Sequence, residues 1–198
     1  MSEYLKSCQS EFWKEVFRKE AEYISRELRG YKSVLSIGCG PAIIEGELQE
    51  NGFNITGLDI SKEALEEAPD SIRTIVGSAE DMEFEDASFN AAIYVASLQF
   101  VNDYGKAIQE TARVLKSHGR LLVMLLNPTA EFFKVKRSQA ESYINKIKHL
   151  DLAPIEEVMQ GYFAVDKAEY YLGIKNEEVF ESQNPNLAAL YIITGVKK

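Results

Sequence analysis

The stretch SVLSIGCGP, residues 33–41, joins a short apolar segment directly to a pair of glycines. The apolar segment at 33–37 predicts a strand buried on both of its faces. Gly38 and Gly40 let the backbone pass close to a ligand because neither residue has a Cβ atom. Pro41 then suits the first turn of a helix. Strand, glycine turn and helix in this order predict a ligand site at the carboxyl end of a parallel sheet.

The same alternation of strand and helix patterns continues through the first two thirds of the chain. It predicts a doubly wound α/β fold, with a mostly parallel sheet and helices on both faces. Apolar segments at 178–181 and 187–196 flank a turn and predict a C-terminal antiparallel hairpin, which brings the expected sheet to seven strands. The remaining predicted strands are 33–37, 53–59, 71–76, 89–96 and 120–126, and the helices between them are 41–50, 62–68 and 104–115.

The chain length of 198 residues suits one domain, and we predict a single domain over 1–198. Residues 1–30 are expected to form an N-terminal helix that ends at Gly30. Residues 129–175 are expected to form a helical segment, which is a candidate lid over an acceptor molecule. The segment begins with an aromatic pair and carries three basic residues, and we interpret it as favouring an anionic or aromatic small molecule. The alternative is a solvated helix face. The residues are Phe132, Phe133, Lys134, Lys136 and Arg137.

Composition excludes several classes of partner. The net charge of −9 disfavours binding to the phosphate backbone of nucleic acids. The two cysteines, Cys8 and Cys39, have neither a metal-binding spacing nor enough partners for a disulfide framework. The longest aliphatic run, 121–126, is too short to cross a membrane, and the N-terminus has no signal-peptide pattern. We therefore expect a cytoplasmic protein without a metal, nucleic-acid or membrane partner, and the sequence leaves its oligomeric state open.

An acidic residue follows the second predicted strand. Asp59 lies 19 residues after Gly40, at a spacing where a carboxylate accepts hydrogen bonds from ribose hydroxyls. The alternative role is a cap for the next helix, but Ser61 already offers that cap. The glycine turn and Asp59 together indicate a ligand that contains adenosine. Ile43 stands where the dinucleotide fingerprint has its third glycine, so NAD fits poorly.

Four segments between residues 33 and 127 carry a family resemblance, in matching order and spacing. The sequence resembles the class I S-adenosylmethionine-dependent methyltransferases, especially the small single-domain type. The resemblance implies a Rossmann-like fold, S-adenosylmethionine as the cofactor, and methyl transfer, here to a small-molecule acceptor. The segments are residues 34–41, 57–61, 77–90 and 112–122.

The resemblance also implies a role for particular residues in binding the cofactor. Gly38 and Gly40 would lie against its methionine part, together with the carbonyl group of Ala96. Asp59 would hold the ribose. The adenine would be bordered by Ile60, Ser78, Ala79 and Glu80, with Met82 packed nearby. No catalytic residue is predicted, because the sulfonium methyl group is already activated and alignment with the acceptor supplies most of the acceleration.

Departures from the family pattern leave a second function open. Family members commonly have an acid at the positions of Ser36, Ser78 and Asn90, a third glycine at Ala42, and a histidine at Gln99. Ser36 and Ser78 still form hydrogen bonds with a cofactor but bring no charge, which weakens binding. The alternative is therefore a non-catalytic regulator or partner subunit that binds S-adenosylmethionine or S-adenosylhomocysteine. A nucleotide-dependent oxidoreductase is the third possibility. The candidates for lining an acceptor pocket are Tyr4, Trp13, Tyr94, Gln99, Tyr143 and Tyr162.

Overall fold

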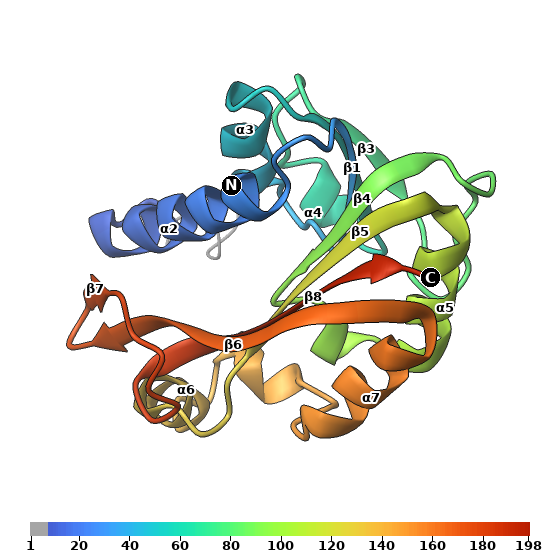
Figure 1. Ribbon diagram of the computed structural model, residues 1–198. Coiled ribbons are helices and arrows are strands. Elements are labelled where there is room, and N and C mark those ends of the chain that lie inside the picture. Colours follow the sequence, from blue (N-terminus) through green and yellow to red (C-terminus); the bar gives the residue numbers. More distant parts are fainter. Residues whose placement is uncertain (1–7) are drawn as a thin grey trace.

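Eight strands form one mixed sheet in the computed structural model, which describes residues 8–198 (Figure 1). The strands are β1 (Ser33–Ile37), β2 (Asn54–Asp59), β3 (Arg73–Val76), β4 (Phe89–Val95), β5 (Leu115–Leu126), β6 (Phe163–Lys175), β7 (Glu178–Phe180) and β8 (Ala188–Lys197). Their order across the sheet is β3-β2-β1-β4-β5-β8-β6-β7. The first five strands are parallel, and the last three are antiparallel to their neighbours. The predicted α/β class with antiparallel C-terminal strands is confirmed.

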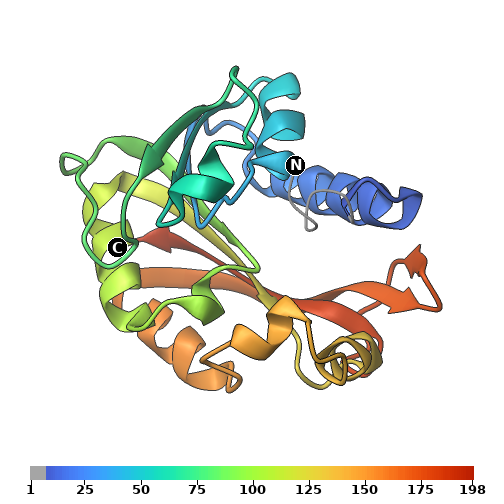
Figure 2. The same cartoon turned by 180° about the vertical axis from the view of Figure 1, so that it is seen from behind.

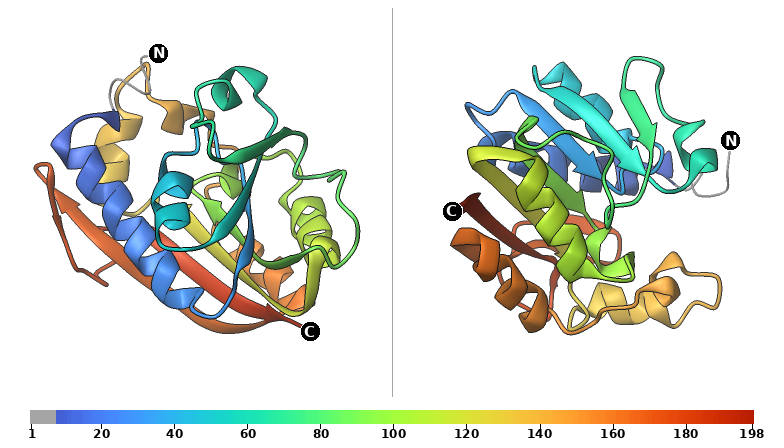
Figure 3. Two further views of the ribbon diagram at one scale, coloured as in Figure 1. Left: turned by 90° about the horizontal axis from the view of Figure 1, so that it is seen from above. Right: turned by 90° about the vertical axis from the view of Figure 1, so that its right-hand side faces the viewer.

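Helices cover both faces of the sheet and enclose two apolar cores (Figures 1 and 2). The helices are α2 (Glu11–Glu27), α3 (Ile43–Glu50), α4 (Lys62–Leu65), α5 (Tyr104–Val114), α6 (Glu131–Arg137) and α7 (Ala153–Tyr162), with single 3₁₀ turns η1 (Leu98–Phe100) and η2 (Tyr143–Lys146). One core lies between the sheet and α2, α3 and α6. The other lies between the sheet and α5 and α7. Figure 3 shows α2 lying beside α3, and both helices pack on the same face of the sheet.

The order of the strands reverses beside β1, which pairs with β2 on one side and β4 on the other. Loops from both halves of the sheet therefore meet at the carboxyl end of β1. The glycine turn there has φ values of 73° at Gly38 and 52° at Gly40. Ala42, at the position of the third family glycine, also adopts a left-handed φ of 54°. A Cβ atom on Gly38 would stand 2.5 Å from the Cβ of Ser97. Only glycine therefore fits at this position, where the turn packs against the loop after β4.

The C-terminal third differs from the sequence prediction. The sheet has eight strands rather than seven, because residues 163–175 form β6 instead of the end of a helical segment over 129–175. The burial of β6 alternates along its first half, as expected for a strand with one solvated face. The predicted hairpin between 178–181 and 187–196 was also wrong in its pairing. β7 turns back on β6 through Asn176 and Glu177, both with positive φ, whereas β8 pairs with β5 and β6.

The predicted helices are shorter in the structure. Within the expected helical segment at 129–175, the structure has three separate short elements, α6, η2 and α7. Of the predicted N-terminal helix at 1–30, α2 accounts for Glu11–Glu27, and residues 1–7 lie outside the described part of the chain. Among the described helices, none is both long enough and apolar enough to cross a membrane.

Gln99 links three segments behind the site. Its side chain is fully buried, and its oxygen accepts a hydrogen bond from the backbone N–H of Leu126 at 2.7 Å. Its amide nitrogen donates to the carbonyl oxygens of Leu126, at 3.1 Å, and His149, at 3.2 Å. The residue that stands in place of a family histidine therefore fixes the end of β5 and the segment before α7 relative to η1.

We expect Gln99→Ala to lower the free energy of unfolding by about 3 kcal/mol, because it leaves buried backbone groups of Leu126 without partners. Urea denaturation measures the loss. Gln109→Ala, at an exposed position of α5, is the matched control and should change stability by no more than about 0.5 kcal/mol. Equal effects of the two substitutions would contradict the structural role of Gln99.

Candidate functional site

Two cavities meet at the carboxyl end of the parallel strands. The smaller has a volume of about 340 Å³, and the larger has a volume of about 820 Å³. Gly38, Ala96 and Phe100 line both cavities. The two cavities are therefore adjacent and share walls where β1 and β4 end.

The smaller cavity brings together most of the residues that the sequence singled out. It is bordered by the segments that follow β1, β2, β3 and β4, because parallel strands end at the same edge of the sheet. Gly40 lies in the larger cavity, and Met82 is buried outside both. Ser36 also lies outside both cavities. The predicted residues that line the smaller cavity are Gly38, Asp59, Ile60, Ser78, Ala79, Glu80 and Ala96.

The carboxylate of Asp59 ties two turns together. One oxygen accepts a hydrogen bond from the backbone N–H of Gly40 at 2.8 Å, and the other accepts from the N–H of Ser61 at 2.8 Å. The N-terminus of α4 is capped by Ser61, whose hydroxyl accepts from the N–H of Ala64 at 3.2 Å. A carboxylate oxygen accepts more than one hydrogen bond. Asp59 therefore holds the glycine turn in place and keeps acceptor capacity for two ligand hydroxyl groups.

The outer wall of the smaller cavity combines an apolar side chain with a fixed loop. Ile60 is 77% exposed beside the cavity, which makes its side chain available to cover the face of a flat ring. Glu80 accepts hydrogen bonds from the backbone N–H groups of Asn102, at 2.7 Å, and Asp103, at 3.0 Å. These bonds hold the loop after β3 against the start of α5.

Glu45, in the first turn of α3, is a site residue that the sequence analysis missed. It is only 3% exposed and lines the larger cavity. The hydroxyl of Ser36 donates a hydrogen bond to its carboxyl group at 2.5 Å. Burial raises the pKa of Glu45 to about 7, and the hydrogen bond from Ser36 acts in the opposite direction. A carboxyl group from the neighbouring helix thus lies in contact with Ser36, where the sequence analysis noted a missing acid.

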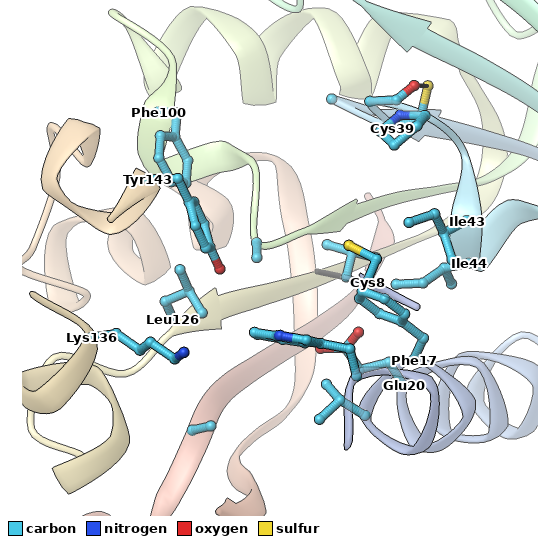
Figure 4. Close-up of a pocket in the computed structure, with 18 of the residues that line it drawn as sticks. Cys8, Phe17, Glu20, Cys39, Ile43, Ile44, Phe100, Leu126, Lys136 and Tyr143 are labelled. Atoms are coloured by element: carbon cyan, nitrogen blue, oxygen red, sulfur yellow. Dashed lines mark hydrogen bonds between the residues drawn. The ribbon is translucent and has the colours of Figure 1, made fainter. Parts of the chain in front are cut away.

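The larger cavity has aromatic walls (Figure 4). On the side of α2, Trp13 stacks on Phe17 with ring centroids 5.7 Å apart. On the opposite side, Phe100 stacks on Tyr143 at 6.0 Å. The ammonium group of Lys136 lies 5.8 Å from the centroid of the Trp13 ring. Such walls bind an apolar or aromatic molecule and exclude water from it.

Only some of the predicted acceptor-pocket residues line this cavity. Trp13 and Tyr143 do, and Lys136 is the member of the basic run that does. Tyr94 is fully buried beside the smaller cavity, where its hydroxyl lies 2.8 Å from that of Thr111. Gln99 is committed to the backbone bonds described above, and Tyr162 lines neither cavity. The predicted contribution of Tyr4 lies outside the described residues.

Glu20, on α2, brings a second buried carboxyl group to the larger cavity. It is 6% exposed, and none of residues 8–198 forms a hydrogen bond or ion pair with it. Burial raises the pKa of Glu20 to about 8, and the negative charges of Glu45 and Glu47 add to the rise. Glu20 and Glu45 are the buried acidic side chains among the described residues.

These raised pKa values predict that stability falls with pH. The folded chain holds the two protons more tightly than the unfolded chain, where a glutamate titrates near its ordinary pKa of 4.5. The stabilisation is therefore complete below about pH 4.5 and is lost as the pH rises through about 7 to 8. We expect Glu20→Gln to unfold at a higher urea concentration than the wild type at about pH 8, and at a similar one at about pH 5.

Urea midpoints across this pH range provide the measurement. Glu11→Gln, at an exposed position on the same helix, is the control and should follow the wild type at every pH. A Glu20→Gln profile as steep as that of the wild type would show that Glu20 does not titrate in this range.

Comparisons with known proteins find similarity to methyltransferases. Residues 35–123 match a family described as "Methyltransferase domain". O-methyltransferase resE of Aspergillus sclerotiorum is 33% identical over 100 residues, which cover 46% of this chain and 38% of that protein. The ubiquinone/menaquinone biosynthesis C-methyltransferase UbiE of Rickettsia massiliae is 24% identical over 187 residues, which cover 87% of this chain and 69% of that protein. The chain thus spans less than half the length of the Aspergillus relative.

A solved structure shares the fold. It belongs to an S-adenosylmethionine-dependent methyltransferase of Thermotoga maritima, described as a possible histamine N-methyltransferase. The TM-score is 0.76 at 21% identity, and the match covers 92% of this chain and 89% of that one. The antiparallel C-terminal strands are therefore part of a known arrangement of this sheet.

Proposed function

The chain carries a class I S-adenosylmethionine-dependent methyltransferase domain, and from this premise we propose that it transfers the methyl group of S-adenosylmethionine to a small organic acceptor. The observation that carries the proposal is the junction of the two cavities at Gly38, Ala96 and Phe100. One cavity has the groups that recognise a nucleoside, and the other is apolar and aromatic. A methyl donor and an acceptor bound on the two sides would meet at the junction.

The residues of the smaller cavity fit the cofactor. Asp59 has free acceptor capacity for the two ribose hydroxyls, and the apolar side chains of Ile60 and Ala79 suit the faces of adenine. The backbone at Gly38 is bare, because Ser97 leaves no room for a Cβ there. We assign the methionine part of the cofactor to this bare backbone and to Ala96. Ser78 and Glu80 complete the border around the adenine.

When bound, the cofactor supplies an already activated methyl group, so the protein needs chiefly to align the acceptor and exclude water. The aromatic walls on either side of the larger cavity suit this task. Phe100 contributes to both cavities, and its stacking on Tyr143 supports the position of its ring at the junction.

We also propose that α6 and η2, within the segment 129–175, cover the acceptor. Phe132, Lys136 and Tyr143 from this segment line the larger cavity opposite α2. Helix α2 forms the facing wall, which supports treating the chain as one domain, since elements near both ends of the sequence complete the same cavity.

Titration of the purified protein with S-adenosylmethionine and S-adenosylhomocysteine by calorimetry tests the proposed function. We expect both to bind, NAD to fail, and Asp59→Ala to weaken binding by about a hundredfold, because it removes charge-assisted hydrogen bonds to the ribose and the tie to Gly40. Asp70→Ala, an exposed position, is the control. If neither sulfur ligand binds, the proposal is wrong.

The contact between Ser36 and Glu45 weakens the argument from missing acids that motivated the non-catalytic alternative, because a carboxyl group is present beside Ser36. We propose that the Glu45 carboxylate binds the amino group of the cofactor's methionine part. Glu45→Gln should weaken S-adenosylhomocysteine binding by about tenfold or more. The double variant Ser36→Asp/Glu45→Ser, which returns the carboxylate to the strand, should recover most of that affinity.

Glu47→Gln, on the same helix but outside the cavity, is the control for charge and should bind like the wild type. Unchanged affinity in Glu45→Gln would remove Glu45 from the cofactor site while leaving the rest of the proposal in place.

A further inference from the structure

Glu20 is the buried carboxyl group for which the cofactor site has no use. It lies on α2, in the wall that faces α6 and η2, and Figure 4 shows it beside Phe17 and Cys8 in the larger cavity. Transfer of a carboxyl group from water into an apolar site costs several kcal/mol unless a partner is present. None of residues 8–198 forms a hydrogen bond or ion pair with Glu20, and its carboxyl oxygens are not among the fully enclosed unpaired atoms, so the carboxyl group opens onto the cavity, where a ligand can supply the partner.

The charges around the larger cavity favour a cation. Among residues 8–198, the acidic residues that line the cavity outnumber the basic ones, since Lys136 is the one basic residue of that lining. Electron-rich aromatic faces from Trp13 and Tyr143 add attraction for a positive group. This composition argues against the anionic acceptor that the basic run of 134–137 suggested. The acidic residues of the lining are Glu20, Glu45, Glu63, Glu67 and Glu141.

We propose that the acceptor carries a basic nitrogen and that Glu20 binds this nitrogen and accepts its proton. The proposal rests on the proposed function, because it assigns the acceptor side of the same site. The acceptor class is an amine with an apolar or aromatic body, which the ring pairs Trp13–Phe17 and Phe100–Tyr143 would hold.

The proton balance is simple. An ammonium group enters and pairs with the Glu20 carboxylate, and the proton then moves to Glu20, since a neutral pair is favoured over an ion pair in an apolar site. The freed nitrogen lone pair forms the new N–C bond as the C–S bond of the donor breaks with its electron pair remaining on sulfur. The proton on Glu20 is finally released to solvent.

Several titratable or charged groups influence Glu20. Glu45 and Glu47 on α3 act on its pKa directly. Lys136 from α6, Tyr143 from η2 and Cys8 line the same cavity. Burial raises the pKa of Glu20 to about 8 in the free protein. Because amine binding needs the Glu20 carboxylate, the affinity for the amine should increase by up to about tenfold for each pH unit as the pH rises toward 8. Above about pH 8 the affinity should level off.

The test uses the whole chain saturated with S-adenosylhomocysteine and three probes that share the phenethyl group and differ in the polar group attached to it. Phenethylamine, 2-phenylethanol and 3-phenylpropanoate are titrated by calorimetry. We expect the amine to bind at least about tenfold more tightly than the alcohol, and the carboxylate to bind least, because only the amine pairs with Glu20. In Glu20→Gln the amine should lose this advantage and the pH dependence of its affinity. Glu47→Gln should keep both.

The outcomes separate the two proposals. If S-adenosylhomocysteine does not bind, the methyl-transfer proposal fails, and the probes are then titrated into the free protein, where a preference for the amine would still support the cation site. If the alcohol or the carboxylate binds as tightly as the amine, or if no amine binding is detected, the assignment of Glu20 is overturned. The comparison of probes on the wild type needs no variant, so it holds even if Glu20→Gln fails to fold.

Discussion

The site depends on the hydrogen bonds by which Asp59 joins the turn after β1 to the turn after β2. Two adjacent parallel strands end in backbone N–H groups that the sheet cannot satisfy. A single carboxylate accepts from Gly40 and Ser61 and thereby fixes both turns. The glycine turn then lies close to Ser97, which leaves bare backbone at the junction of the two cavities. The same side chain that shapes the site also retains the capacity to bind a ligand, so structure and recognition cannot be separated at this position.

A second constraint concerns charge in the buried part of the site. A carboxyl group at position 36 of β1 and one at position 45 of α3 would occupy the same buried region. In this chain the carboxyl group comes from Glu45 on α3. Ser36 on β1 donates its hydroxyl hydrogen to Glu45, so the polar groups satisfy each other inside the core. The absence of an acid at position 36 therefore does not leave this region without a carboxyl group, because Glu45 brings one there from nine positions away in the sequence.

Local sequence patterns were enough to predict most residues of the smaller cavity but not those of the larger cavity. The glycine turn, Asp59 and the loop after β3 occur at strand ends, where the parallel topology alone brings them together. The acceptor cavity instead takes its walls from α2, α6 and η2, whose relative positions depend on long-range packing. Glu20 and Glu45 read as solvated helix residues in the sequence, and only the fold buries them. β6 was missed because its alternating burial includes charged residues that resemble a helix surface.

The division of the larger cavity between distant segments has a consequence for how such a protein changes over time. Apart from Lys148, the described residues that line the smaller cavity lie within residues 35–123, whereas Glu20, Phe132, Lys136 and Tyr143 of the larger cavity lie outside that range. Substitutions in α2 or α6 therefore alter the acceptor walls without touching Asp59 or the glycine turn. Substitutions can therefore change which molecules the larger cavity admits while the smaller cavity is inherited intact, and related chains can diverge in α2 and α6 while they remain alike over residues 35–123.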